Sequence, residues 1–533
     1  MFCHPDMGTA PFTTTYERGF FMSGSSIAIL IAFACYLLIM ILIGIMSMKK
    51  TKNTEDYFLG GRGLNGWVAA LSAQASDMSG WLLMGLPGSI YAFGTGQAWI
   101  AIGLFLGTVL NWLLIAKRLR RYTIVANNSL TLPEFFENRF HDTKKILLSI
   151  SSIVIVIFFL VYTASALASG GKLFNNVFGI DYHIALAIGA IVILTYTFLG
   201  GFLAVCTTDF IQGTMMLIAL LIVPIAAYAM IQSDFSAALA GTGVVSSDYM
   251  SLFSNDGKPY TFVEIISQLA WGLGYCGMPH ILVRFMAIRS EKEIKKSSTI
   301  AIIWVAISLI AAWAIGVVGR AFLGGALEDS ENVFIQMIQH VFSGNIVLIF
   351  IGGLFLCGIL AAIMSTADSQ LLVCASSVSK DIYKNIIKPD ADDKKVLKIS
   401  RLTVAAIAIL AFLIAWNPDS SIMKLVSDAW AGLGSAFGPL VVCSLFWKRT
   451  NLAGAVSGIL SGGLFVIIWD YVPVVNGSTL SDATGIYSLL LGFFFSLACI
   501  VIVSLCTKKP EQSILDDFEK AKDYVESKSL LSK

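Results

Sequence analysis

Thirteen long apolar runs recur along the chain, and they constrain its fold more than any other feature. A helix needs about 20 apolar residues to cross the hydrocarbon core of a bilayer, where every backbone polar group must be satisfied within the protein. The sequence therefore predicts an all-α polytopic membrane protein with about 13 transmembrane helices. The predicted spans cover residues 25–46, 67–93, 97–116, 146–170, 183–202, 209–232, 261–284, 298–321, 345–372, 401–416, 422–446, 451–472 and 484–506.

The composition agrees with this class and narrows the partners. Hydrophobic residues make up 56% of the chain and charged residues 13%, values typical of a membrane protein. The net charge of +2 gives no reason to invoke nucleic acid. The nine cysteines are scattered without a CxxC pair, so neither a disulfide framework nor a zinc site is expected.

Basic residues fall into alternate loops, which predicts the orientation of the chain. Most of the 36 Lys and Arg residues lie in the loops that face one side if the N-terminus is outside, and basic loops are retained in the cytoplasm. We expect a multi-pass protein of the cytoplasmic (inner) membrane with a cytoplasmic C-terminus. The basic loops are 47–66, 117–145, 284–297, 373–400, 447–450 and the tail from 507. The expected organisation is an extracytoplasmic leader (1–24), one transmembrane transporter domain (25–506) and a cytoplasmic tail (507–533) with a short amphipathic helix.

Two of the predicted spans are interrupted. The second contains Ser76–Gly80, and the seventh contains three glycines followed by Pro279, residues that weaken a helix. The two interrupted spans lie five spans apart, so two five-helix halves, residues 67–232 and 261–446, would enter the membrane from opposite sides. Corresponding interruptions in two inverted halves are a sequence indicator of a transporter binding site. The topology thus predicts a five-plus-five inverted-repeat transporter fold with discontinuous helices.

The first interruption carries an acid inside an apolar segment. An ionisable side chain such as Asp77 is costly there without a partner, and by default it marks a functional site. An unwound backbone at this point would free the carbonyls of Ala75 and Met78 for a hard cation such as sodium. Asp77 either neutralises the ion directly or holds the break by accepting backbone N–H bonds; two helices joined by small residues and one hydrogen-bonded acid are the alternative.

The ninth span adds two consecutive hydroxyls, Ser365 and Thr366, to these oxygen atoms. They can converge on one ion with the carbonyl of Ala362, one turn earlier. The alternative is that both bond back to their own helix. Asp368 shares a face with Ser365 and is a candidate for the surroundings of the ion. Asp209 opens the predicted sixth span and is either a way-station for the ion or a stabilising acid at a helix start.

Aromatic residues near the two interruptions are candidates for a solute pocket. Trp81 follows the first, while Trp271 and Tyr275, four residues apart, are expected to share one helix face before the second; Tyr162 lies in the fourth span. Aromatic rings suit an apolar ring or a cationic amine. Aromatic residues are frequent in membrane cores and belts, so any one of them taken alone is more often packing than a ligand.

At these residues the chain resembles the sodium:solute symporter family, and most closely its proline branch. The resemblance runs from about Tyr57 to past Tyr383. The shared motifs are Tyr57–Arg62, Ala75–Gly88, Leu130–Pro133, the glycine signature Tyr196–Ala204, Gly274–Leu282 and Ile363–Thr366. Cys276 and Met278 stand where relatives vary, which leaves the fine substrate preference open.

The resemblance implies sodium-coupled uptake of L-proline by alternating access, with sodium as the co-transported ion. The sodium positions it implies are Ala75, Asp77, Met78, Ala362, Ser365 and Thr366. The positions it associates with proline or its pocket are Ser79, Gly80, Trp81, Tyr162, Trp271, Tyr275 and Pro279. Arg62 falls on a position linked to transport activity, whereas any role of Asp368 is our inference.

Two other functions are alternatives to this one. The near alternative is a sodium-coupled symporter for another amino acid or an osmolyte, since the family includes carriers for other solutes. A transporter-like solute sensor is a second, although the tail after Cys506 is short for a signalling domain. No enzyme is expected, because the sequence has no HExxH motif and its five histidines are dispersed.

Overall fold

The computed structural model describes residues 24–48, 54–197, 201–231, 234–255, 257–325, 327–474 and 477–524. The expected leader falls outside this part of the chain except for Gly24. Three positions of the glycine signature, residues 198–200, and the last part of the tail, residues 525–533, also lie outside the described residues.

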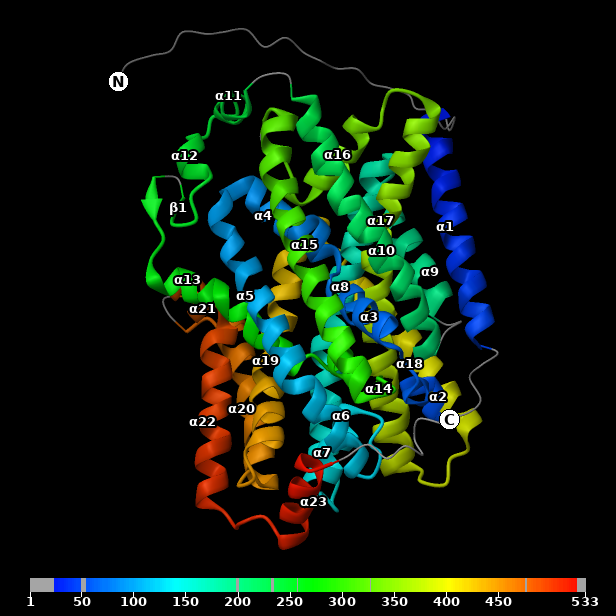
Figure 1. Ribbon diagram of the computed structural model, residues 1–533, viewed down its shortest axis with the longest axis vertical. Helices are drawn as coiled ribbons and strands as arrows, with labels where there is room; N and C mark the ends of the chain where they lie inside the picture. The colour runs from blue at the N-terminus through cyan, green and yellow to red at the C-terminus, as the bar shows by residue number, and fades with distance from the viewer. Residues whose placement is uncertain are drawn as a thin grey trace.

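Helices make up nearly all of the described chain (Figure 1). The first half contains α1 (Gly24–Met48), α2 (Thr54–Leu59), α3 (Gly66–Asp77), α4 (Leu86–Phe93), α5 (Ala98–Leu110), α6 (Ala116–Val125), α7 (Leu132–Phe140), α8 (Ile146–Phe178), α9 (Tyr182–Thr197) and α10 (Phe202–Met230). A connecting segment holds α11 (Phe235–Ala240), α12 (Ser246–Tyr249) and an antiparallel pair of short strands, β1 (Ser254–Asn255) and β2 (Lys258–Pro259). The second half contains α13 (Phe262–Leu269), α14 (Pro279–Ala287), α15 (Glu291–Leu323), α16 (Val333–Val341), α17 (Ile346–Ser376), α18 (Asp393–Ile414) and α19 (Ile422–Phe446). The chain continues with α20 (Leu452–Tyr471), α21 (Leu480–Thr484), α22 (Ser488–Cys506) and α23 (Gln512–Lys522).

The all-α membrane architecture predicted from the sequence is confirmed. Within the described chain, ten helices are long and apolar enough to cross a membrane. The shorter α9 and the two interrupted spans account for the other three predicted spans, so the count of thirteen stays a prediction. Figure 1 places α6, α7 and α23 at one end of the molecule and α11, α12 and β1 at the other. We call the first of these the basic end, because the basic loops around α6 and α7 lie there.

Both predicted interruptions are present. Asn65 caps the start of α3 by accepting the amides of Trp67 and Val68, and the helix ends at Asp77. Met78 leaves the helical conformation, with φ −81° and ψ 73°. The chain then passes through a π-helical segment, Trp81–Gly85, into α4.

The second interruption is a 3₁₀ segment, Ala270–Gly277, between α13 and α14. Its glycines allow close contact with neighbouring helices. A Cβ on Gly272 would lie 2.2 Å from the carbonyl oxygen of Gly103 in α5, and one on Gly274 would lie 2.0 Å from the indole nitrogen of Trp430 in α19. The unwound segment is thus seated between α5 and α19, where only glycine fits.

Three expectations from the sequence are wrong in detail. The sixth span begins at Phe202, so Asp209 lies in the third turn of α10 and does not open the helix. Arg284 belongs to α14 rather than to a loop beginning at residue 284, and the connection to α15 is correspondingly short. Trp271 and Tyr275 do not share one face, because residues four apart in a 3₁₀ helix point about 120° from each other.

Candidate ion and solute site

Oxygen atoms from α3 and α17 converge at the first interruption. The hydroxyl of Ser365 donates to the carbonyl of Ala75 at 2.7 Å and to that of Ala362 at 3.2 Å. The hydroxyl of Thr366 donates to the same Ala75 carbonyl at 3.5 Å. The two hydroxyls are therefore directed across the helix interface and not only back to their own helix. Two hydroxyl and two carbonyl oxygens at one buried point are ligands suited to a hard monovalent cation.

Met78 lies next to this group, immediately after the end of α3. Its amide completes the last turn by donating to Gln74 at 2.9 Å. In a continuous helix its carbonyl would accept from Leu82, but that amide donates to Ser79 at 3.1 Å instead. The break thus redirects the donor that would otherwise occupy the Met78 carbonyl, which agrees with its predicted role as an ion ligand.

Asp77 connects the two interruptions. The hydroxyl of Tyr275 donates to one of its carboxylate oxygens at 2.7 Å. Its backbone carbonyl accepts the indole N–H of Trp81 at 3.0 Å and the Ser79 amide at 2.9 Å, with the hydroxyl of Tyr162 at 3.5 Å. The second carboxylate oxygen is buried and has no hydrogen-bond partner among the described residues. Asp77 therefore holds the break through its carbonyl and keeps one acceptor available.

Three other residues of the first interruption are buried against α8. Ser79 and Trp81 are each 1% exposed, and the Ser79 hydroxyl accepts the Trp81 amide at 3.4 Å. At Gly80 a Cβ would lie 2.3 Å from the hydroxyl of Ser169. Tyr162, also on α8, lies close to the imidazole of His280 with ring centres 6.3 Å apart. The predicted solute residues Ser79, Gly80, Trp81 and Tyr162 are thus brought together.

Trp271 packs against aromatic residues from the C-terminal part of the chain. Its ring stacks on Tyr487, with ring centres 5.2 Å apart, and its carbonyl accepts the indole N–H of Trp430 at 2.8 Å. Tyr275 contacts the same Trp430 edge to face at 5.2 Å. Trp430 and Tyr487 are additions that the sequence did not reveal, because each lies more than 150 residues from Trp271 and has no distinctive motif around it.

A buried polar network lies between the first interruption and the basic end. Arg284 forms an ion pair with Asp209 at 3.1 Å and donates to Ser72 at 3.1 Å and to Ser369 at 2.6 Å. Ser369 in turn lies 3.3 Å from a carboxylate oxygen of Asp368. In the described chain, Asp209 and Asp368 each have one carboxylate oxygen without a partner. The sequence places Arg284 at the boundary between the seventh predicted span, 261–284, and the basic loop 284–297, whereas the structure buries it inside α14.

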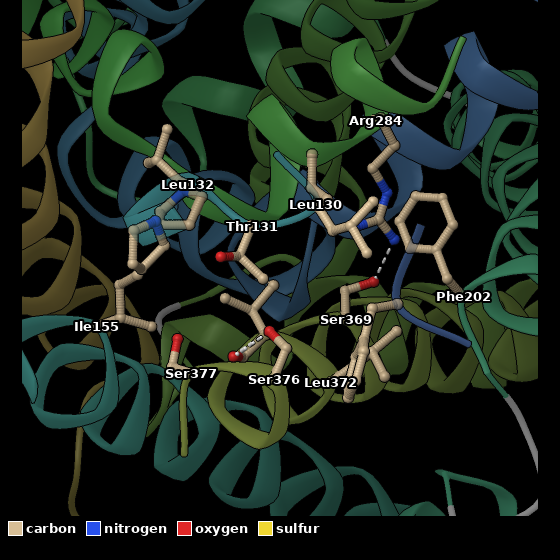
Figure 2. A pocket seen from close by; sticks show the side chains of 15 residues that line it. Leu130, Thr131, Leu132, Ile155, Phe202, Arg284, Ser369, Leu372, Ser376 and Ser377 are labelled. Carbon is tan, nitrogen blue, oxygen red and sulfur yellow. Dashed lines mark hydrogen bonds between the residues drawn. The ribbon is translucent and has the colours of Figure 1, made fainter. Parts of the chain in front are cut away.

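Figure 2 shows a pocket that is lined by two residues of this network, Arg284 and Ser369. Arg284 and Ser369 lie on one side of it, joined by a hydrogen bond, and Thr131 and Ser377 lie farther along. Pro279, the first residue of α14, also lines this pocket, together with Arg284 of the same helix. The remaining lining residues are Phe58, Leu130, Leu132, Pro133, Ile155, Phe202, Val283, Leu372, Val373 and Ser376.

Arg62 closes the basic end of the site. Its guanidinium donates to the carbonyls of Met286 at 2.6 Å and Ser129 at 2.8 Å, and its Nε donates to Asn128 at 2.8 Å. Burial lowers the pKa of Arg62 to about 10, with a further contribution from the nearby Arg120. The side chain therefore stays charged near neutral pH and fastens the last turn of α14 to the segment before α7.

Two broken helices joined by the Tyr275–Asp77 hydrogen bond, with a buried cluster of oxygen ligands beside the first break, define a secondary transporter. A sequence profile of the sodium:solute symporter family matches residues 57–462, and the chain belongs to that family.

Relatives agree with this membership, and solved structures share the fold. A sodium/proline symporter of Staphylococcus aureus is 44% identical over 93% of this chain and 96% of its own, and that of strain JH9 is 45% identical with the same coverage. A Na⁺-coupled sialic acid symporter in an outward-open state has the same fold, with a TM-score of 0.73 at 20% identity over 92% of this chain and 99% of the other. A nucleobase-cation-symport-1 family transporter is more distant, with a TM-score of 0.50 at 12% identity over 88% of this chain and 98% of its own.

Proposed function

We propose that this protein is a sodium-coupled symporter that takes up L-proline across the cytoplasmic membrane. The observation that carries the sodium part is the convergence of Ser365 and Thr366 on the carbonyl of Ala75. The proline part is supported by the relatives, which are named sodium/proline symporters and cover nearly the whole chain. A sodium-coupled symporter for another amino acid or an osmolyte is the alternative.

Sodium would bind between α3 and α17. Its proposed ligands are the carbonyls of Ala75, Met78 and Ala362 and the hydroxyls of Ser365 and Thr366. For the ion to enter, the hydroxyl hydrogens must turn away from the Ala75 carbonyl so that their lone pairs face the cation. An ion bound there would fix the end of α3 and hence the position of Asp77.

Proline would bind beside the two interruptions. Ser79, Gly80, Trp81 and Tyr162 form one side of the proposed pocket, and Tyr275 forms the other, with Trp271 and Pro279 beyond it. The amine of proline has an acceptor available in the free carboxylate oxygen of Asp77. Its carboxylate would find donors where unwound segments expose backbone N–H groups.

Coupling would arise because both ligands act on Asp77. A ligand shifts a conformational equilibrium only by its difference in affinity for the two states. Sodium orders the helix end that carries Asp77, and proline orders Tyr275 and the second interruption, so each ligand improves the site of the other through the 2.7 Å contact. Release would follow the pocket lined by Arg284 and Ser369 toward the basic end.

We further propose that the basic end is cytoplasmic and that the N-terminus is outside, in the inner membrane. The positive-inside rule supports this orientation. The order of elements supports the proposed inverted halves, residues 67–232 and 261–446, since each starts with an interrupted helix, α3–α4 and α13–α14. In this orientation Arg62 and the Asp209–Arg284–Asp368 network lie on the cytoplasmic side of the site.

The test is uptake of labelled L-proline by purified protein in liposomes with an imposed sodium gradient. We expect accumulation that collapses when the gradient is dissipated. Equal uptake with potassium replacing sodium would contradict coupling. Competition with unlabelled betaine, pantothenate or another amino acid separates the substrates: if one of these displaces proline at a lower concentration than proline itself, proline is not the main solute.

A further inference from the structure

A second pocket lies at the basic end, outside the ion and solute site. It is enclosed by α6, the last turn of α19 and the C-terminal helix α23, which Figure 1 shows beside α6 (Figure 1). Half of its lining side chains are basic. The lining residues are Lys117, Arg118, Arg121, Tyr122, Leu445, Phe518, Ala521 and Lys522.

Nearby carboxylates balance only part of this charge. Glu291 contacts Lys117 at 3.3 Å and Arg121 at 2.9 Å, and Glu519 contacts Lys522 at 3.5 Å. Arg118 has no carboxylate partner among the described residues. Glu291 and Glu519 thus offset part of the charge of the four lining cations, and Arg118 keeps a positive charge at the pocket without a carboxylate contact in the described chain.

A buried arginine lies directly behind this pocket. Arg139 is 2% exposed, and its Nε donates to the carbonyl of Ser444 at 3.1 Å. Its other two nitrogens have no hydrogen-bond partner in the described chain, and neither has the hydroxyl of Tyr122. The guanidinium lies over the rings of Tyr122 and Phe518, 5.1 and 5.2 Å from their centres. Asp517 on α23 offsets part of the Arg139 charge from a distance, and an anion in the pocket would offset more of the cost of burying it.

An exposed apolar surface leads to the same pocket from the end of α5 and from the π-helical segment Asn111–Ile115, which joins α5 to α6. Leu110, Leu113 and Leu114 are 54%, 59% and 51% exposed on this span. Lys117 and Arg118 at the start of α6 are exposed as well, so basic side chains follow the exposed leucines along the span. Arg118 is also held over the ring of Phe446, 4.2 Å from its centre, which keeps its charge at the end of the apolar surface.

We propose that this pocket binds the phosphate group of an anionic phospholipid from the leaflet at the basic end. The acyl chains lie along the exposed leucines Leu110, Leu113 and Leu114, and the phosphate accepts hydrogen bonds from Lys117, Arg118 and Lys522. Basic pockets between transmembrane helices are a known way to recognise such headgroups. A bound lipid would fasten α23 to α6, because the pocket is lined by both.

Native mass spectrometry of the full chain with added phosphatidylglycerol tests this proposal. The variant is Lys117→Gln with Arg118→Gln, and the matched control is Lys292→Gln with Lys295→Gln, which removes the same charge from exposed positions at the same end. We expect the first variant to bind phosphatidylglycerol about tenfold more weakly than the wild type and the control to bind it normally. Lys522→Gln is a second, milder variant that should weaken lipid binding even if the double variant folds poorly.

Three results would overturn the proposal. One is that the wild type and both pocket variants retain phosphatidylglycerol equally. Another is retention of phosphatidylcholine as strong as that of phosphatidylglycerol, which would mean that the charge is not recognised. The third is displacement of the lipid by millimolar inorganic phosphate, which would assign the site to a free anion.

Discussion

The hydroxyl of Tyr275 and the carboxylate of Asp77 lie 2.7 Å apart, although 198 residues separate them in the chain. The hydrogen bond joins the two interrupted helices at the point where each is unwound. Asp77 is therefore part of both proposed sites. It lies at the end of α3, next to the proposed sodium ligands, and its carboxylate faces the proposed solute pocket. The consequences can be tested one contact at a time.

Tyr275→Phe removes this hydrogen bond and keeps the ring against Trp430. We expect weaker proline binding and a smaller effect of sodium on it, since a buried hydrogen bond to a charged group contributes about 1.5–3 kcal/mol. The measurement is the affinity for proline at low and saturating sodium. Tyr182→Phe, which removes a hydroxyl that donates to Ala415 far along the chain, is the control. An unchanged ratio of the two affinities would show that the contact does not couple the sites.

Ser365→Ala and Thr366→Ala each remove one proposed ligand of sodium. We expect the sodium concentration for half-maximal uptake to rise about tenfold, equivalent to about 1.4 kcal/mol, with a smaller change in the affinity for proline at saturating sodium. Thr403→Ala serves as the control, because its hydroxyl bonds only to its own helix at Ile399. Unaltered sodium dependence in both variants would exclude α17 from the ion site.

Arg284→Met should destabilise the protein. It leaves the buried Asp209 without its cation, and breaking one partner of a buried ion pair costs about 3–5 kcal/mol. Adding Asp209→Asn removes the stranded charge and should restore part of the stability. Thermal unfolding in detergent measures both effects. Asp209→Asn alone gives the loss of unfolding temperature to compare with. If Asp209→Asn lowers the unfolding temperature as much in the Arg284→Met background as in the wild type, the Asp209–Arg284 ion pair does not stabilise the protein.

A contact between Lys172 and Glu331 closes the end of the molecule opposite the basic end. Glu331 accepts the lysine at 2.7 Å and the first amides of α19, Ile422 and Met423, at 3.1 and 3.0 Å. The segment that carries Glu331 also lies against α4, where a Cβ on Gly88 would be 2.8 Å from the Glu331 Cα. Glu331 thus joins α8 and α19 through its carboxylate and lies against α4 through its backbone.

Glu331→Ala should open this end. We expect a cysteine placed at Ser165, in a background without native cysteines, to react several-fold faster with a membrane-impermeant maleimide applied from that side. Glu328→Ala, at an exposed position three residues earlier, is the matched control. Equal reaction rates in the two variants would mean that Glu331 does not hold the closed state.

Much of the fold could be predicted because it depends on local properties of the chain. Apolar runs of membrane length specify helices whatever surrounds them. Glycine and proline weaken a helix wherever they occur, so both interruptions could be placed from sequence. The bounds of α8, α10 and α17 were less accurate, because their ends are set by contacts with neighbouring helices and not by hydropathy.

Some residues of the candidate site could likewise be predicted from the sequence, and others could not. Asp77, Ser365 and Thr366 could be selected from sequence, since polar groups in an apolar span are costly and so stand out. The position of Trp271 could not, because the 3₁₀ geometry of its segment follows from close contact of its glycines with α5 and α19. Trp430 and Tyr487 have no local signal at all.

The sequence by itself determined that the chain crosses a membrane many times, where two of its helices break, and which oxygen-bearing residues lie near the first break. The tertiary structure decided that Tyr275 reaches Asp77, that Arg284 is buried beside Asp209, and that Arg62 fastens α14. The physical reason is that a span is a property of about 20 consecutive residues, whereas an ion pair or a hydrogen bond between helices depends on packing among residues far apart in the sequence, 75 positions for Asp209 and Arg284 and 198 for Asp77 and Tyr275.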